Sequence, residues 1–235
     1  MAYALSDEGA LVTIADYDAR TLQSLSGAFY CVTLDVRDRV QWLIAKAAAE
    51  TKYGPVSILC NNAGIGPNVA ELADTDPDTF DRMIAIKLTG TFNGVHAFAA
   101  DMRARGEGHI VNTASMAGLE IIATLGAYTA SKFGVVGMTE VLRKEMAPHG
   151  VGVSVLCPGM VSTGLPASTA KADGREPPSQ TMPGIEPARV AARVIEAIKG
   201  NWPYILTHGE RQQAVGVRHS AIIDAFASTP HSNEL

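Results

Sequence analysis

The sequence predicts an α/β protein in which helices cover both faces of a doubly wound parallel sheet. Apolar runs of strand length alternate with longer segments of helical pattern along the chain. Parallel strands need crossover connections long enough to hold a helix, and the segments between these runs meet that need. With 235 residues and 47% hydrophobic content, the chain can bury one large core, and we expect a single domain over residues 1–235.

The elements follow in order from a short helix at the start. Met1 to Asp7 has the helical spacing of apolar residues, and Glu8–Gly9 supplies its stop. Strands are predicted at 11–16, 30–36, 56–64, 108–115, 151–159 and 203–207. Their continuous Val, Ile and Leu content fits burial on both faces of a sheet. Helical patterns follow the third, fourth and fifth of these runs, and an amphipathic helix is predicted over 210–226.

Composition and charge exclude several function classes. A net charge of -5 with scattered Lys and Arg argues against a nucleic acid partner, because phosphate binding calls for a basic face. No apolar run approaches the roughly 20 residues of a membrane span, and the N-terminus lacks the layout of a signal peptide. Cys31, Cys60 and Cys157 fit reduced buried thiols better than a disulfide framework. We expect a soluble, cytoplasmic protein without a membrane partner.

Metal-dependent and acyl-transfer chemistry find little support. The six His residues show no short metal-ligand spacing, so no metal is expected. Ser115 lies in TASMAG and not in the G-x-S-x-G turn of hydrolases, which argues against a nucleophilic serine.

Polar residues and glycines gather where the predicted strands end. Ligands of such sheets bind at the carboxyl ends of the strands, so these residues decide function. In chain order they are Asp16, Asp35–Val36, Asn61–Asn62–Ala63–Gly64, Ser115 and Pro158–Gly159. We expect all of them at one edge of the sheet.

The stretch GAYTASKFG, residues 126–134, carries the strongest chemical signal. Tyr128 and Lys132 are four residues apart in a helical pattern, so their side chains share a face. A phenol with a pKa of about 10 is a poor base at neutral pH, but a nearby ammonium favours the phenolate and lowers that pKa. Ser115, at a strand end, has a hydroxyl that can hold a substrate oxygen. Together the three residues make an acid/base centre.

These features together resemble the short-chain dehydrogenase/reductase family in its single-domain, Rossmann-like form. The resemblance rests on the strand-end Asp, NNAG, Ser115, YTASK and PGMVST at 158–163, in order from Met1 to about Ile205. It implies hydride transfer between a nicotinamide cofactor and a secondary alcohol or ketone. Tyr128 would be the acid/base, Lys132 would bind the nicotinamide ribose and lower the pKa of Tyr128, and Ser115 would orient the substrate oxygen.

The resemblance also implies a set of cofactor contacts. Asn62, Ala63 and Gly64 would line the cofactor groove, Asp35 and Val36 would flank adenine, and the nicotinamide side would be formed by Pro158, Gly159, Val161 and Thr163. The role of Asp16 also follows from its chemistry alone, because a carboxylate there can accept hydrogen bonds from both ribose hydroxyls and would repel a 2′-phosphate. NAD is therefore favoured over NADP. The alternative is that Asp16 merely caps the next helix.

The chain departs from the family pattern in two places. A first strand and a glycine-rich turn precede the initial helix in the family, and both are expected to be missing here, which would expose two strand edges. Three explanations remain open: a start codon assigned too late, a sequence that lacks its first residues, or a genuinely shortened paralogue. The second departure is Lys87, where the family usually has Asn; an ammonium cannot accept hydrogen bonds as an amide does, so the proton relay is in doubt.

Substrate recognition is assigned to the segment 160–184, which is expected to form a lid loop rich in Pro, Gly, Ser and Thr. The apolar stretch 121–125 would form one wall, which suggests a partly hydrophobic alcohol. Residues 228–235 are expected to be a flexible tail. The resemblance implies a homo-oligomer, either a dimer or a tetramer.

Two functions of different classes remain open. The first is an NAD-dependent dehydrogenase or ketone reductase, which the combination of Ser115, Tyr128 and Lys132 supports. The second is a catalytically silent chain that keeps the fold as a binding or assembly partner, which the absent turn and Lys87 support.

Overall fold

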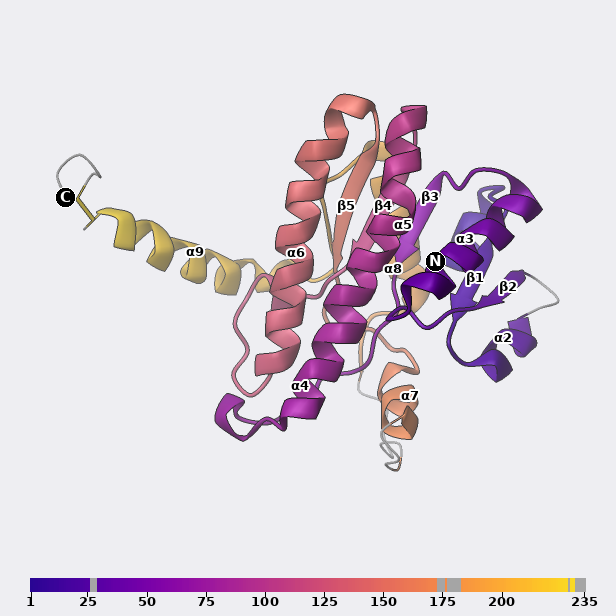
Figure 1. Ribbon diagram of the computed structural model, residues 1–235. Coiled ribbons are helices and arrows are strands. Elements are labelled where there is room, and N and C mark those ends of the chain that lie inside the picture. The colour runs from indigo at the N-terminus through magenta and orange to yellow at the C-terminus, as the bar shows by residue number, and fades with distance from the viewer. Residues whose placement is uncertain (26–28, 173–175, 177–182, 228, 231–235) are drawn as a thin grey trace.

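The computed structural model describes residues 1–25, 29–172, 176, 183–227 and 229–230. Its strands are β1 (Thr13–Asp16), β2 (Tyr30–Thr33), β3 (Ile58–Asn61), β4 (His109–Thr113), β5 (Gly152–Cys157) and β6 (Tyr204–Leu206), as Figure 1 shows. Each strand lies inside its predicted range and is shorter by residues that turn away from the ladder. The expected flexible tail at 228–235 lies outside the described residues apart from 229–230.

The helices alternate with the strands. They are α1 (Ala2–Asp7), α2 (Ala19–Leu25), α3 (Arg39–Tyr53), α4 (Pro77–Ile84), α5 (Gly90–Arg105), α6 (Gly126–Met146), α7 (Leu165–Ala172), α8 (Pro187–Gly200) and α9 (Gln212–Ala227). A π-helical segment, η2 (Ala85–Thr89), joins α4 to α5, and the short 3₁₀ turns are η1 (Leu72–Asp74), η3 (Met116–Gly118), η4 (Ala147–His149) and η5 (Gly209–Arg211).

The described strands form two parallel sheets. β1 pairs with β2, and the second sheet has the order β3-β4-β5-β6. In the second sheet Asn61 of β3 stands opposite Asn112 of β4, and Thr113 stands opposite Leu156 of β5. Because the strands of each sheet run in the same direction, their carboxyl ends lie at a common edge. The α/β, Rossmann-like fold class is confirmed.

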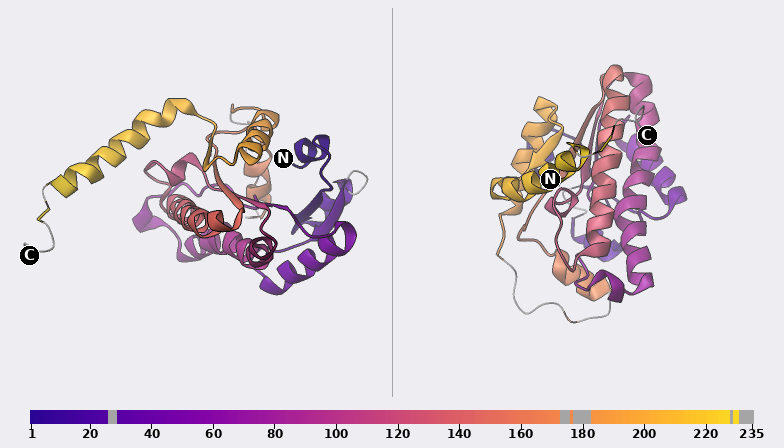
Figure 2. Two further views of the ribbon diagram at one scale, coloured as in Figure 1. Left: turned by 90° about the horizontal axis from the view of Figure 1, so that it is seen from above. Right: turned by 90° about the vertical axis from the view of Figure 1, so that its left-hand side faces the viewer.

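Helices cover both faces of the four-stranded sheet, as Figure 2 shows in two further views. On one face, buried side chains of α5 and α6 pack on the strands: Phe98, Met102, Val135, Leu142 and Met146 against Ile110, Val153 and Val155. On the other face, α8 packs Val190, Val194 and Ala197 against Val111, Leu156 and Ile205. Burial of each large aliphatic side chain contributes about 1.5–3 kcal/mol.

Local sequence explains where the longer helices begin and end. The carboxylate of Asp38 accepts hydrogen bonds from the backbone N–H groups of Val40 and Gln41, which caps α3. Asp76 caps α4 in the same way, with Pro77 at the first helical position. α5 ends at Gly106, whose φ of 75° lies in the left-handed region that glycine favours.

Part of the segment predicted as a lid loop is helical. Within 160–184, residues 165–172 form α7, while 173–175 and 177–182 lie outside the described residues. Thr169 of α7 accepts a hydrogen bond at Oγ1 from the N–H of Gly66, 2.6 Å away, and this bond ties α7 to the segment that follows β3. The predicted C-terminal helix is confirmed as α9, which extends away from the rest of the fold (Figures 1 and 2).

Candidate active site

Ser115, Tyr128 and Lys132 come together where β4 and β5 end. The side chain of Ser115 lies close enough to the Tyr128 hydroxyl to lower the pKa of Tyr128. The ammonium nitrogen of Lys132 lies 5.9 Å from the centre of the Tyr128 ring and donates a hydrogen bond of 2.7 Å to the carbonyl oxygen of Thr113. The hydroxyl of Ser115 also reaches the carbonyl oxygen of Pro158 at 3.4 Å. A hydroxyl, a phenol and an amine therefore share one site, in which Ser115 and Lys132 are buried and Tyr128 is partly buried.

The chain builds this site from one loop and one helix. Ser115 follows β4 in an extended conformation, and its Oγ accepts the N–H of Ala117 to cap η3. α6 turns Lys132 and Ser131 toward the protein interior, with exposed fractions of 4% and 0%. The two elements touch at Gly118, where an added Cβ would lie 2.7 Å from the carbonyl oxygen of Lys132. Glycine at 118 is therefore a condition for the packing of η3 against α6.

Burial dominates the proton affinities at the site. It lowers the pKa of Lys132 to about 8, because an ammonium loses hydration there. Burial raises the pKa of Tyr128, and the interaction with Ser115 opposes that rise. The sequence predicts a lowered pKa for Tyr128, and for the chain by itself that prediction is wrong in direction. The reason is that removal of the phenolate from water outweighs its interaction with Ser115.

The NNAG segment is fixed to the same edge. Asn62 accepts a hydrogen bond at Oδ1 from the hydroxyl of Thr113, 3.1 Å away, so the ends of β3 and β4 are joined through side chains. Beneath it, Asn61 donates to the buried side chain of Asn112 at 2.8 Å. The backbone from Asn62 through Ala63 to Gly64 thus lies beside the strand end to which Lys132 is bonded.

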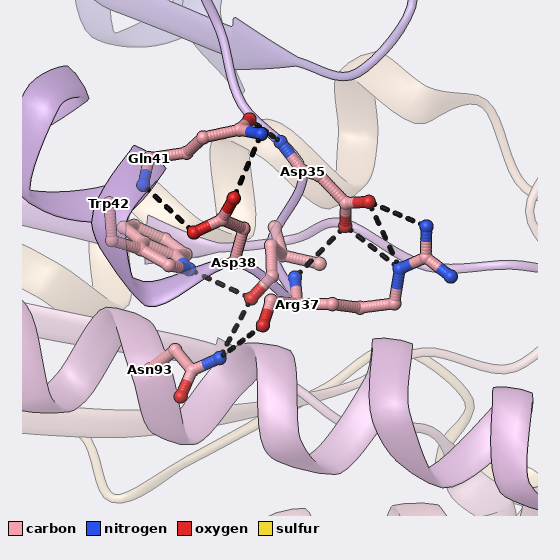
Figure 3. Close-up of polar contacts among 7 residues, drawn as sticks. Asp35, Arg37, Asp38, Gln41, Trp42 and Asn93 are labelled. Atoms are coloured by element: carbon pink, nitrogen blue, oxygen red, sulfur yellow. Dashed lines mark hydrogen bonds and ion pairs between the residues drawn. The ribbon is translucent and has the colours of Figure 1, made fainter.

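Asp35 is held by its own neighbour, as Figure 3 shows. The guanidinium of Arg37 donates from Nε to both carboxylate oxygens of Asp35, at 2.9 and 3.0 Å, and this interaction lowers the pKa of Asp35. The carbonyl oxygen of Val36 accepts hydrogen bonds from the side chains of Trp42 and Asn93, at 2.9 and 3.0 Å. The segment after β2 is therefore rigid, and most of the acceptor capacity of Asp35 is already used.

Asp16 ends β1 with a carboxylate that is only partly engaged. Its Oδ1 accepts the N–H of Asp18 at 2.9 Å in the turn that leads into α2. The other oxygen, Oδ2, has no hydrogen-bond partner within the described part of the chain. Asp16 therefore supports the start of the next helix and still presents an acceptor at the sheet edge.

The segment after β5 contributes the remaining predicted positions. The N–H of Gly159 approaches Nδ1 of His208 at 3.2 Å, and an added Cβ on Gly159 would meet that ring at 2.6 Å. Val161 forms an isolated parallel bridge with Ile185, and Thr163 accepts the N–H of Leu165 at the start of α7. Gly159 therefore packs against the segment that follows β6, Val161 lies toward α8 and Thr163 lies at the start of α7.

Sequence comparison decides the family. The family model described as "short chain dehydrogenase" matches residues 1–174. The chain belongs to the short-chain dehydrogenase family. Ser115, Tyr128 and Lys132 all lie inside the matched residues.

Individual relatives agree with this assignment. The chain is 34% identical over 224 residues to the probable oxidoreductase EphD of Mycobacterium tuberculosis, covering 86% of this chain and 37% of that protein. It is 35% identical over 164 residues to a 3-alpha-(or 20-beta)-hydroxysteroid dehydrogenase of the same organism, covering 68% of this chain and 63% of the relative. The chain thus spans about a third to two thirds of the length of these curated relatives.

Among solved structures, a short-chain dehydrogenase/reductase of Burkholderia phymatum in complex with NAD is 30% identical to this chain. The two superpose with a TM-score of 0.80, covering 98% of this chain and 92% of the other. This likeness extends beyond the residues that the family model matches and includes the region of α8 and β6.

Lys87 is the position at which the sequence predicts a departure from the family pattern. It lies in the π-helical segment η2 and is 2% exposed. Its Nζ stands 4.6 Å from the centre of the Tyr128 ring, closer than that of Lys132. Burial, with the charge of Lys132 as the second cause, lowers the pKa of Lys87 to about 6.

Sequence reasoning missed several residues that shape the site. Arg37 and Asn93 fix the segment after β2, and His208 contacts Gly159. A signal existed for Arg37, because an Asp-x-Arg spacing allows a local ion pair. Asn93 and His208 reach their partners across 57 and 49 residues of chain, a relationship that a single sequence does not carry.

No helix in the described ranges has the length and apolar character to span a membrane. The same residues hold no group of three or more His, Cys, Asp or Glu side chains placed to bind a metal ion.

Proposed function

We propose that this short-chain dehydrogenase interconverts a secondary alcohol and a ketone with NAD(H), and that Tyr128 is the acid/base. The observation that carries the proposal is that the side chains of Ser115 and Tyr128 interact beside the amine of Lys132, 5.9 Å from the Tyr128 ring centre, at the carboxyl edge of the sheet. A substrate oxygen placed between the hydroxyl and the phenol would be held by one and would exchange a proton with the other.

The raised pKa of Tyr128 bears on the direction of the reaction. At neutral pH the side chain is a phenol, which is the form that donates a proton to the carbonyl oxygen of a ketone. The hydroxyl of Ser115 orients that oxygen, and Lys132, whose pKa is about 8, supplies a positive charge beside the phenolate that forms. When bound, the nicotinamide cofactor supplies the hydride. We therefore propose ketone reduction as the favoured direction near neutral pH.

The residues at the carboxyl ends of the strands in the two sheets have chemistry that suits a nicotinamide dinucleotide. Asp16 retains an acceptor oxygen at the end of β1, Gly64 and Gly159 bring backbone without side chains to the edge, and Lys132 provides the cation. A carboxylate at Asp16 accepts ribose hydroxyl protons and repels a 2′-phosphate, so NAD is the proposed cofactor. The Burkholderia phymatum relative, which is in complex with NAD, supports this choice.

The proposed substrate is a partly hydrophobic, cyclic secondary alcohol or the matching ketone. An open depression of about 520 Å³ lies between the segment after η3 and the start of α9; its lining combines the apolar Ile121 and Val217 with charged side chains such as Glu120 and Arg211, and does not include Ser115, Tyr128 or Lys132. Ile121 belongs to the apolar stretch predicted to form one wall of the site. The hydroxysteroid dehydrogenase relative acts, by its name, on a hydroxysteroid, which is an apolar molecule built of fused rings.

Cofactor binding and turnover test the proposed function directly. NADH and NADPH are titrated separately into the purified chain while nicotinamide fluorescence is followed, and saturable binding of NADH is expected. A panel of cyclic and linear ketones is then assayed for NADH oxidation. The alternative, a catalytically silent assembly partner, is not favoured. If the chain bound neither NADH nor NADPH, the dehydrogenase would be rejected in favour of that alternative.

We also propose a homo-oligomer and a cytoplasmic location. The support for an oligomer is α9, which projects from the fold with Val217, Ile223 and Phe226 exposed. Light scattering measures the mass of the particle in solution, and a monomer at all concentrations would reject the oligomer.

A further inference from the structure

The amine of Lys87 is enclosed between two parts of the active site. On one side it faces the ring of Tyr128, 4.6 Å from the ring centre. On the other side lies the turn at Gly64, where a Cβ built on the backbone would stand 3.2 Å from Nζ. With the side chain 2% exposed, the amine has little access to water. Lys87 therefore lies between the NNAG segment and Tyr128 of α6, the residue that is proposed to exchange a proton with the substrate oxygen.

The helix around Lys87 is built to place that amine. η2 widens the helix by one residue per turn over Ala85–Thr89, and such π-helical bulges occur often at functional sites. The carbonyl oxygen of Lys87 accepts a hydrogen bond from the hydroxyl of Thr91 at 2.7 Å, which satisfies a backbone group that the bulge displaces. The backbone at Lys87 is thus fixed independently of the amine.

The amine has an unusual set of neighbours. Two titratable groups, both on α6, are near it: the ring of Tyr128 contacts the amine, and the charge of Lys132 lowers its pKa. Cys157 of β5 in turn influences the pKa of Lys132. Within the described residues no carboxylate contributes to the proton affinity of Lys87, and its Nζ has no hydrogen-bond partner. A buried amine without a counter-ion binds its proton weakly, and a like charge nearby weakens it further. The aromatic face of Tyr128 is its main attractive contact.

We propose that Lys87 is a positioning residue of the acid/base centre: its amine holds the Tyr128 ring against the turn at Gly64 and gives the centre a second exchangeable proton. This role rests on the proposed function, because it presupposes that Tyr128 exchanges a proton with the substrate. In the protonated form, Lys87 places a cation on the ring and stabilises the phenolate that remains after Tyr128 has donated its proton. In the neutral form it holds the ring without that stabilisation.

The proton affinity of Lys87 gives the role a signature in the pH dependence. With its pKa near 6, Lys87 is an ammonium at pH 5 and a neutral amine at pH 8. We expect kcat for ketone reduction to rise about tenfold as pH falls through this range. The reason is that the interaction of the Lys87 ammonium with the developing phenolate, at an effective dielectric constant of about 20, exceeds the energy that corresponds to a tenfold change in rate. A decline in kcat near pH 8, where Lys132 loses its proton, is expected in every variant that keeps Lys132.

The test uses Lys87→Met, with Lys46→Met as the matched control. Lys46 also places its ammonium over an aromatic ring, 5.6 Å from the centre of Phe98, but it lies on α3, away from the site. The first readout is the pH profile of kcat for NADH-dependent reduction. Lys87→Met is expected to lose the rise below pH 7, whereas Lys46→Met is expected to keep it. A rise that persists in Lys87→Met would overturn the proposal.

The second readout needs neither substrate nor cofactor. Tyrosine is labelled with ¹³C in the ring, the Tyr128 signal is assigned through Tyr128→Phe, and its shift is followed between pH 4.5 and 9. An inflection near pH 6 is expected in the wild type and in Lys46→Met, and it is expected to vanish in Lys87→Met. If the wild type reduces ketones but its Tyr128 signal shows no inflection near pH 6, the role of Lys87 is overturned and the proposed function stands. The inflection in a chain that reduces no ketone with either dinucleotide would overturn the proposed function, and with it the catalytic meaning of Lys87.

Discussion

Lys132 donates a hydrogen bond from Nζ to the carbonyl oxygen of Thr113, 2.7 Å away, and thereby joins α6 to the end of β4. The hydroxyl of the same Thr113 donates to Asn62 after β3. The position of Lys132, and with it that of Tyr128 one helical turn earlier, is therefore set by the sheet and not by α6 alone. Replacements at the site act on a preorganised geometry, which makes their effects specific.

Tyr128→Phe is expected to lower kcat for ketone reduction by about 10²–10⁴-fold, the range that a positioned acid/base contributes. Phenylalanine keeps the ring that Lys87 and Lys132 contact, so the stability and the affinity for NADH should change little. Steady-state assays and a fluorescence titration measure the two quantities. Tyr53→Phe, on the C-terminal turn of α3, is the control and should retain full activity. Retention of kcat within threefold in Tyr128→Phe would assign proton transfer to another group.

Gly118→Ala is expected to destabilise the fold by about 1–3 kcal/mol, as overpacking does in close-packed interiors. The new Cβ would stand 2.7 Å from the backbone oxygen of Lys132 and 3.0 Å from Cγ2 of Val136, so α6 must shift. Gly137→Ala is the matched control on α6, because a Cβ there meets nothing within 4 Å. Alanine in that exposed helical position should stabilise by about 0.5–1 kcal/mol. Denaturant unfolding measures both, and equal effects of the two substitutions would contradict the packing at Gly118.

The sequence predicts the fold class and the strand positions because burial on both faces leaves an unbroken apolar run. β5 shows this most clearly, since every residue from Gly152 to Cys157 is buried. Helical spacing likewise suffices to place Tyr128 and Lys132 on α6. The same reasoning misses α7, although the Ala-rich stretch of residues 165–172 has fair helix propensity, because the Pro and Gly content of the surrounding segment favours a loop.

The proton affinities at the site could not be predicted from the spacing of residues. The sequence pairs Tyr128 with a cation and predicts a lowered pKa, but burial, which is a property of the whole packed site, raises that pKa. Lys87 is recognisable in the sequence as a departure, yet its contact with the Tyr128 ring depends on η2 and on packing against α6. A single sequence reports which groups are present and leaves their degree of burial to tertiary structure.

Asp16→Asn is expected to reduce the preference for NADH over NADPH by at least about tenfold, because a hydrogen bond to a charged group contributes about 1.5–3 kcal/mol. The amide keeps an acceptor for the N–H of Asp18, so the turn into α2 is preserved while the negative charge is lost. Affinity for NADPH should rise and affinity for NADH should fall in fluorescence titrations. Asp78→Asn, an exposed position in α4, is the control. An unchanged ratio of the two affinities would mean that Asp16 serves only its turn.

Asp35 and Arg37 should make the free energy of unfolding depend on pH in the acid range. The guanidinium of Arg37 holds the pKa of Asp35 below its usual value near 3.8 in the folded chain. A carboxyl group whose pKa is lower in the folded state contributes stability that is fully present above its unfolded pKa, and this contribution is lost as pH falls through the folded value. Urea unfolding at pH 7 and at pH 3 should therefore differ more in the wild type than in Arg37→Met. Arg20→Met, at a pair whose Arg side chain is 79% exposed, should leave that difference unchanged. If Arg37→Met showed the wild-type difference, the ion pair in Figure 3 would contribute nothing to acid stability.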